Sequence, residues 1–165
     1  FLIGFMGCGK TTIGKLLAEQ LNYQFIDSDE EIEKETKLTI SAIFNEFGES
    51  HFRKLEDDLI QNLINCKNSV ISTGGGLPCF NNQIEKLLEI GTVVFIKTSF
   101  ENLIERIHST NRPLVSNLKN DERIHFLEQL VEIRKPIYER ADIIVNGNQS
   151  TEAIINEILA KCQHI

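Results

Sequence analysis

A glycine-rich stretch near the start of the chain has the residue types and the spacing needed to hold a polyphosphate. Residues 4–12 read GFMGCGKTT and match the P-loop pattern GxxxxGK[ST] at every required position. Glycines let successive backbone N–H groups turn toward one anion, and a following helix adds its partial positive charge. Lys10 would reach the β- and γ-phosphates, and the Thr11 hydroxyl would ligate Mg²⁺. The stretch predicts a nucleotide-phosphate site made by Gly7, Cys8, Gly9, Lys10, Thr11 and Thr12.

Two carboxylates follow the next apolar run. Residues 23–26 read as a strand, and Asp27 and Asp29 come directly after it. Because side chains alternate along an extended chain, the two are expected to point the same way. One could then serve Mg²⁺, with Asp27 as the nearest candidate, while the other accepts a proton from a substrate hydroxyl. Helix capping is the alternative, since Asx residues commonly precede a helix.

Three consecutive glycines, Gly74, Gly75 and Gly76, follow the third apolar run. Glycine costs roughly 0.5–1 kcal/mol relative to alanine in regular structure, because its backbone loses more freedom on folding. A simple loop would rarely use three, so a γ-phosphate or a polar ring is expected to approach this backbone closely. A flexible turn is the alternative.

Three arginines are the most informative basic residues. Arg134 shares a helical stripe with apolar residues, which turns its guanidinium toward the domain, and Arg53 can pair with Glu56 three residues later. The two together suggest a bidentate grip on a substrate carboxylate, with structural ion pairs as the alternative. Arg112 lies in a polar segment and is predicted to be the cation of a water-excluding lid, with a solvated surface residue as the alternative.

Alternating apolar runs and amphipathic stretches must position these residues. Residues 1–3, 23–26, 69–72, 92–96 and 142–145 read as strands, with helical periodicity between them. This alternation predicts a three-layer α/β/α fold around a five-stranded parallel sheet with right-handed crossovers. Ligands of such sheets bind at the carboxyl ends of the strands. The loop, the carboxylates and the glycines all fall at such ends.

Composition narrows the classes of partner. The chain has 165 residues, suggesting one domain, and its net charge of −7 without a basic run argues against nucleic acid and acidic membranes. Its four scattered cysteines give no disulfide or zinc pattern, which fits a reducing cytoplasm. No apolar stretch approaches the roughly 20 residues that span a bilayer. The expected partners are small molecules, bound by a cytoplasmic monomer.

The motifs in order resemble the shikimate kinase family over essentially the whole chain. They are GFMGCGKTTIGKLLA, DSD, FRKLE, STGGG, RPL and RKPIYERAD. The resemblance implies a P-loop kinase fold similar to nucleoside monophosphate kinases, formed by a single domain of residues 1–165. Within it, a helical shikimate-binding region is expected at about residues 29–66 and a lid at about 109–122. It also implies transfer of the ATP γ-phosphoryl group to the 3-hydroxyl of shikimate, giving shikimate 3-phosphate and ADP, a step of chorismate and aromatic amino acid biosynthesis.

The resemblance assigns a role to each matched residue. The catalytic residues would be Lys10, Asp29 and Arg112, with Asp29 receiving the hydroxyl proton. Shikimate would be bound by Asp29, Arg53, Gly74, Gly75, Gly76 and Arg134, and Mg²⁺ by Thr11 and, through its waters, Asp27. On the nucleotide side, Arg106 resembles an adenine-stacking arginine, Arg112 matches the lid arginine, and Gln149 is placed near the adenine. Cys8 departs from the more usual Ser or Ala, and its thiol is expected to be open to alkylation that blocks ATP.

Other functions remain open. A related P-loop kinase for gluconate or for a nucleoside monophosphate shares the phosphate loop, but the glycine triplet together with Arg53 and Arg134 disfavours it. A regulatory module that binds ATP without catalysis would not need Asp29, these two arginines and a lid arginine together.

Overall fold

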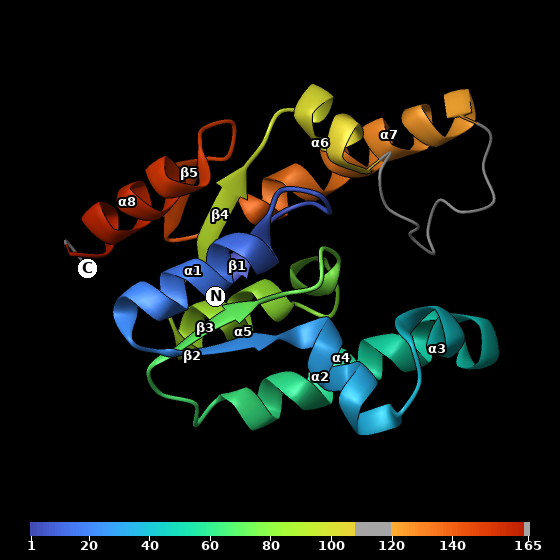
Figure 1. Ribbon diagram of the computed structural model, residues 1–165. Coiled ribbons are helices and arrows are strands. Elements are labelled where there is room, and N and C mark those ends of the chain that lie inside the picture. The colour runs from blue at the N-terminus through green and yellow to red at the C-terminus, as the bar shows by residue number, and fades with distance from the viewer. Residues whose placement is uncertain (108–119, 164–165) are drawn as a thin grey trace.

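Five parallel strands form the centre of the fold. The computed structural model describes residues 1–107 and 120–163, and its sheet has the strand order β2-β3-β1-β4-β5 (Figure 1). The strands are β1 (Leu2–Ile3), β2 (Gln24–Asp27), β3 (Ser69–Ser72), β4 (Val94–Lys97) and β5 (Ile143–Asn146). All four neighbouring pairs are parallel. The predicted fold class is therefore confirmed, and no predicted strand end differs from the observed one by more than two residues.

Helices cover both faces of this sheet. The first helix, α1 (Lys10–Leu21), packs beside the last, α8 (Thr151–Cys162), on one face, and α5 (Gln83–Ile90) and α7 (Asn120–Tyr138) lie on the other (Figure 1). A short 3₁₀ turn, η1 (Leu77–Cys79), follows β3, and α6 (Phe100–Ile107) follows β4. The sheet and these helices share one apolar core, as expected for a parallel sheet covered on both sides.

Three helices between β2 and β3 surround a second, smaller core. They are α2 (Ser28–Thr36), α3 (Ile40–Phe47) and α4 (Glu49–Leu63), and they lie beyond the β2 edge of the sheet (Figure 1). This core contains Ile26, Ile32, Ile43, Phe52, Leu59, Leu63 and Ile71. Helices thus fill the segment of about residues 29–66 for which the sequence predicts them. Most of the predicted lid, including Arg112, lies outside the described residues.

Two further sequence expectations concern the whole chain. Cys8, Cys66, Cys79 and Cys162 are all free thiols, in line with the absence of a disulfide pattern. Within the described ranges, no helix combines the length and the apolar character that crossing a membrane requires.

Gly48 separates α3 from α4 with a backbone conformation that favours glycine. Its φ of 80° and ψ of 170° fall in a region that is essentially restricted to glycine. No atom lies within 4 Å of a Cβ built there, so the cost of a side chain is purely conformational. Gly48→Ala should lower the free energy of unfolding by about 1–3 kcal/mol, measured by urea denaturation.

The matched control is Lys37→Gly at the C-cap of α2. Lys37 has a φ of 60° and a ψ of 19°, which glycine adopts more readily than lysine. This change should therefore leave the stability unchanged or raise it. An unfolding midpoint for Gly48→Ala equal to that of the wild type would contradict the assignment of strain to Gly48.

Candidate active site

The phosphate-binding loop joins β1 to α1 and takes its shape from two glycines. Gly7 and Gly9 have φ values of 83° and 95°, which side chains other than glycine rarely allow. Gly9 is the N-cap of α1, and no side chain caps this end of the helix. The first-turn N–H groups of α1 are therefore available to an anion above the loop.

Lys10 lies over this loop and is almost completely buried. Its ammonium donates hydrogen bonds to the carbonyl oxygen of Gly4 at 2.9 Å and to that of Phe5 at 3.1 Å. The sulfur of Cys8 lies 3.6 Å from the same nitrogen. A buried ammonium held by carbonyl groups places a positive charge at the loop, where a polyphosphate would need one.

Asp27 ends β2 and connects two parts of the site. Its Oδ2 accepts a hydrogen bond from the Thr11 hydroxyl at 2.8 Å, and its Oδ1 accepts one from the Asp29 backbone N–H at 3.1 Å. Asp27 is thus the N-cap of α2, which was the alternative interpretation, and it also contacts the phosphate-binding loop. The cap and the contact with Thr11 coexist because each uses a different carboxylate oxygen.

The expectation that Asp27 and Asp29 point the same way along a strand is wrong. The strand ends at Asp27, and Asp29 already belongs to the first turn of α2, because the Asp27 side chain caps its N–H. Both residues nevertheless line the cavity above the loop, together with Lys10 and Thr11.

The three glycines after β3 form a wall against which other parts of the site pack. We call residues 74–76 the glycine wall. A Cβ on Gly74 would lie 2.6 Å from Asp29 Oδ1, and one on Gly75 would lie 3.2 Å from the backbone nitrogen of Met6. None of the three glycines has a positive φ, so close approach, not backbone conformation, excludes side chains here. The atoms that approach these glycines belong to the protein itself, and the predicted approach of a γ-phosphate or a polar ring stays a prediction.

Arg53 is buried against the glycine wall and paired as predicted. Its Nη1 donates a hydrogen bond to Glu56 Oε2 at 2.6 Å, and its guanidinium lies 3.8 Å from the centre of the Phe80 ring. The Arg53 and Glu56 side chains are 9% and 2% exposed. Burial raises the pKa of the Glu56 carboxyl to about 7, although the neighbouring guanidinium acts in the opposite direction. The pair is therefore a buried one that holds Arg53 at the edge of a cavity.

Arg134 enters the same cavity from α7, with its side chain turned inward as the helical stripe predicts. It is 4% exposed and its guanidinium lies 5.8 Å from the centre of the Phe5 ring. Its Nη1 is buried and has no hydrogen-bond partner among the described residues. A buried guanidinium nitrogen without an acceptor is costly, so an anionic ligand in this cavity would satisfy it.

Two side chains that sequence reasoning did not single out hold the glycine wall. The Tyr138 hydroxyl donates a hydrogen bond to the Gly75 carbonyl at 2.5 Å, and the Ser28 hydroxyl accepts one from the Gly74 N–H at 2.7 Å. Both contacts join segments far apart in the sequence, so no local pattern indicates them. The DSD motif does contain Ser28, but it gives no sign of its partner.

Two cavities meet at the glycine wall. The cavity above the phosphate-binding loop has a volume of about 310 Å³, and the one bounded by Arg53 and Arg134 has a volume of about 90 Å³. Asp29, Gly74 and Gly75 line both. A phosphate donor in the first cavity and a small anionic acceptor in the second would therefore meet beside the Asp29 carboxylate.

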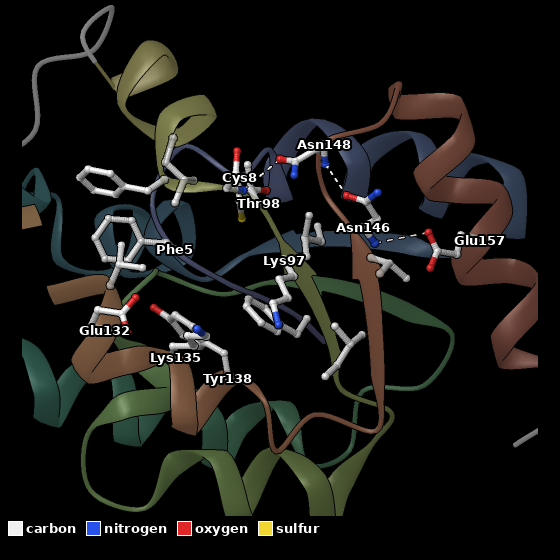
Figure 2. Close-up of a pocket in the computed structure, with 18 residues that line it drawn as sticks. Phe5, Cys8, Lys97, Thr98, Glu132, Lys135, Tyr138, Asn146, Asn148 and Glu157 are labelled. Carbon is white, nitrogen blue, oxygen red and sulfur yellow. Dashed lines mark hydrogen bonds between the residues drawn. The ribbon is translucent and has the colours of Figure 1, made fainter. Parts of the chain in front are cut away.

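A separate cavity of about 580 Å³ lies behind the loop, between β4, β5 and α7 (Figure 2). Phe5, Cys8, Lys97 and Tyr138 are among the residues around it (Figure 2). Cys8 itself is only 1% exposed, so the expected ready alkylation of its thiol is not supported. A reagent could reach this sulfur only if the loop or its neighbours moved.

The remaining predicted nucleotide contacts differ in their placement. Arg106 lines the cavity above the loop and donates a hydrogen bond to the Gly7 carbonyl at 3.5 Å. Gln149 does not line that cavity, and its side-chain amide donates to Glu157 at 2.8 Å. Arg112 lies outside the described residues.

The fold and the site define a P-loop kinase that acts on a small molecule. The phosphate-binding loop, the parallel sheet and the adjoining acceptor cavity are the elements of that class.

Comparison with known proteins then gives the family. A sequence model of the family described as "Shikimate kinase" matches residues 6–163. Proteins named shikimate kinase from Persephonella marina and Aquifex aeolicus are 46% and 42% identical to this chain, and the alignments cover 98% and 96% of this chain and 96% and 92% of theirs. The chain therefore belongs to the shikimate kinase family.

Solved structures agree with this assignment. A shikimate kinase structure from Bacteroides thetaiotaomicron has a TM-score of 0.93 at 35% identity, covering 99% of this chain and 97% of that chain. The Acinetobacter baumannii shikimate kinase in complex with shikimate has a TM-score of 0.92 at 37% identity, covering 99% of this chain and 91% of that chain. A gluconokinase from Sinorhizobium meliloti, 20% identical with a TM-score of 0.61, shares the fold.

The two hydrogen bonds of Asp27 can be separated by substitution. Asp27→Ala removes the cap of α2 and should lower the free energy of unfolding by about 0.5–2 kcal/mol. Asp27→Asn keeps an acceptor oxygen for the Asp29 N–H, and asparagine caps helices as well as aspartate, so its stability should stay near that of the wild type. Urea denaturation measures both. Equal destabilisation by the two changes would show that the carboxylate charge, and not the cap, holds α2.

Proposed function

We propose that the protein transfers the γ-phosphoryl group of ATP to the 3-hydroxyl of shikimate. The observation that carries this proposal is the meeting of the two cavities at Asp29, with two buried arginines around the smaller one. Arg53 and Arg134 would hold the ring carboxylate, since guanidinium groups bind carboxylates bidentately. The acceptor hydroxyl would then face the phosphate-binding loop.

The transfer makes one bond to the γ-phosphorus and breaks one. The 3-oxygen of shikimate bonds to the γ-phosphorus while the bond from that phosphorus to the β–γ bridging oxygen breaks, giving shikimate 3-phosphate and ADP. Asp29 takes the hydroxyl proton. Lys10 and the loop amides hold the β- and γ-phosphates and oppose their charge. Because this transition state has little covalent character, positioning and charge stabilisation carry most of the catalysis.

The residues beside the loop suit a Mg²⁺ ion that accompanies ATP. The Thr11 hydroxyl and the Asp27 carboxylate lie 2.8 Å apart and both line the loop cavity. The described part of the chain has no group of three or more His, Cys, Asp or Glu side chains that would hold a metal unaided. Thr11 would ligate the ion directly and Asp27 through water, with phosphate oxygens as further ligands. When bound, Mg²⁺ neutralises charge on the transferred phosphate.

The other assignments complete this proposal. Arg106 would stack on adenine, which its position at the loop cavity supports. Arg112 would cover the migrating phosphoryl group from a lid at about residues 109–122. The helical region of about residues 29–66 would bind the acceptor, because Asp29 and Arg53 come from it. The adenine contact of Gln149, the monomeric state and the cytoplasmic location stay predictions.

The alternative kinases fit the acceptor cavity less well. A volume of about 90 Å³ is closer to a single small ring than to a nucleoside. The buried Arg134 Nη1, which has no partner among the described residues, favours an anion at the ring itself. A ring carboxylate meets both requirements.

A coupled assay of ADP release tests the reaction. With shikimate, quinate and gluconate compared at equal concentration, shikimate should stimulate ADP release far more than the other two. Stimulation by gluconate alone, or by none of the three, would overturn the proposed function.

Arg134→Ala tests the carboxylate grip. Losing a charge-assisted hydrogen bond should raise the KM for shikimate by roughly ten- to a hundredfold, while the KM for ATP changes less than about twofold. The control is Arg140→Ala, which removes a half-exposed arginine that pairs with Glu85 and should change neither constant. Equal increases in both constants for Arg134→Ala would indicate a structural role.

A further inference from the structure

Two carboxylates of its own helix bracket the Arg53 guanidinium, and they differ in burial. Glu56 Oε2 accepts from Nη1 at 2.6 Å, and its side chain is 2% exposed. Glu49 Oε1 accepts from both Nε, at 3.1 Å, and Nη2, at 2.7 Å, and its side chain is 48% exposed. Glu49 is the first residue of α4, one helical turn before Arg53.

The two carboxylates leave one part of the guanidinium open. A guanidinium has five N–H groups, of which these contacts use three. Glu49 occupies the edge between Nε and Nη2, so one N–H remains on each of the terminal nitrogens Nη1 and Nη2. These two N–H groups are the ones that an anionic ligand could use.

The end of the guanidinium fork packs against the glycine wall. A Cβ built on Gly76 would lie 2.9 Å from both terminal nitrogens and 3.3 Å from Cζ. Because this Cβ position is equally distant from the two nitrogens and farther from Cζ, it lies beyond the end of the guanidinium fork, in the guanidinium plane. The Gly76 backbone therefore packs against the end of the fork, and a side chain there would displace Arg53. Arg53 lines the same cavity as Arg134 and Asp29, so an acceptor carboxylate in this cavity would accept from the N–H groups that Glu49 and Glu56 do not use.

We propose that Glu49 is a positioning residue, which orients Arg53 so that its remaining N–H groups receive the carboxylate of the acceptor; this rests on the proposed function. The half-exposed Glu49 does not compete with the substrate, because it binds a different edge of the guanidinium. It fixes rotation about the last side-chain bonds of Arg53, while Phe80 at 3.8 Å supports the guanidinium face. Prior fixing of this flexible side chain lowers the entropy lost on binding.

The backbone favours this role for Glu49. Gly48 ends α3 and allows α4 to begin at Glu49. A carboxylate in the first helical turn is stabilised by the helix dipole, and a glutamate four residues before a basic residue is the favourable order. The break between α3 and α4 and the orientation of Arg53 are thus linked through the side chain of Glu49.

Kinetics of three variants test this proposal. Glu49→Ala should raise the KM for shikimate by about three- to tenfold, with kcat and the KM for ATP within about twofold. Glu49→Gln keeps an oxygen that can accept from Nε and Nη2 and should restore most of the affinity. The control is Asp58→Ala, which removes an exposed negative charge from the same helix and should leave both KM values unchanged.

The KM values of the Glu49 variants distinguish a positioning role of Glu49 from other roles. A lower KM for shikimate in Glu49→Ala would mean that Glu49 competes with the substrate, and an unchanged KM would mean that it does not act on Arg53; either overturns the proposal. Equal changes in the two KM values would indicate a general loss of structure and would also overturn it. Absence of shikimate phosphorylation by the wild type would instead remove the proposed function on which it rests.

Discussion

The register of three parallel strands is the constraint on which the site depends. Ser72, the last residue of β3, pairs with Leu2 of β1 on one side and with Asp27 of β2 on the other. The loops that follow these strands therefore leave the sheet at nearly the same level. The phosphate-binding loop, the start of α2 and the glycine wall are brought together by this register alone, before any side-chain contact forms.

Three buried positive charges have to be stabilised by the rest of the site. Lys10, Arg53 and Arg134 are each less than a tenth exposed, and only Arg53 has a buried carboxylate as its partner. Lys10 is held by backbone carbonyl oxygens, which are weaker compensation for a full charge. Asp29 lines both cavities, Asp27 lines the first and Glu56 the second, so carboxylates offset these cations. The buried Nη1 of Arg134, which has no partner among the described residues, and the uncapped start of α1 favour anionic ligands, as both a nucleotide polyphosphate and a ring carboxylate are.

The sequence predicts the sheet well because buried strands and amphipathic helices have distinct periods, and it predicts the Arg53–Glu56 pair because helical spacing is fixed. The sequence predicts contacts between segments far apart in the chain less well. Helix α2 has almost no apolar stripe, with Ile32 as its one buried apolar residue. The sequence therefore does not indicate that the helix already includes Asp29, and it predicts an extended strand end there. The contact of Tyr138 with Gly75 spans 63 residues, so only the folded chain reveals it. Glu49 lies one helical turn from Arg53, and the same spacing rule applies to it.

The glycine wall shows that the distance between the phosphoryl donor and the acceptor limits this site more than acid–base strength does. Phosphoryl transfer requires the attacking oxygen and the phosphorus to be held in line at close range. The phosphate-binding loop and the acceptor cavity share this wall, and the Met6 nitrogen lies close enough to Gly75 that even a methyl group would be in tight contact at 3.2 Å. A side chain at the wall would thicken the partition between donor and acceptor, or displace Asp29 or Arg53 from it. The absence of side chains at residues 74–76 is therefore a condition for bringing the two substrates together, because no charged group elsewhere in the site compensates for a longer transfer distance.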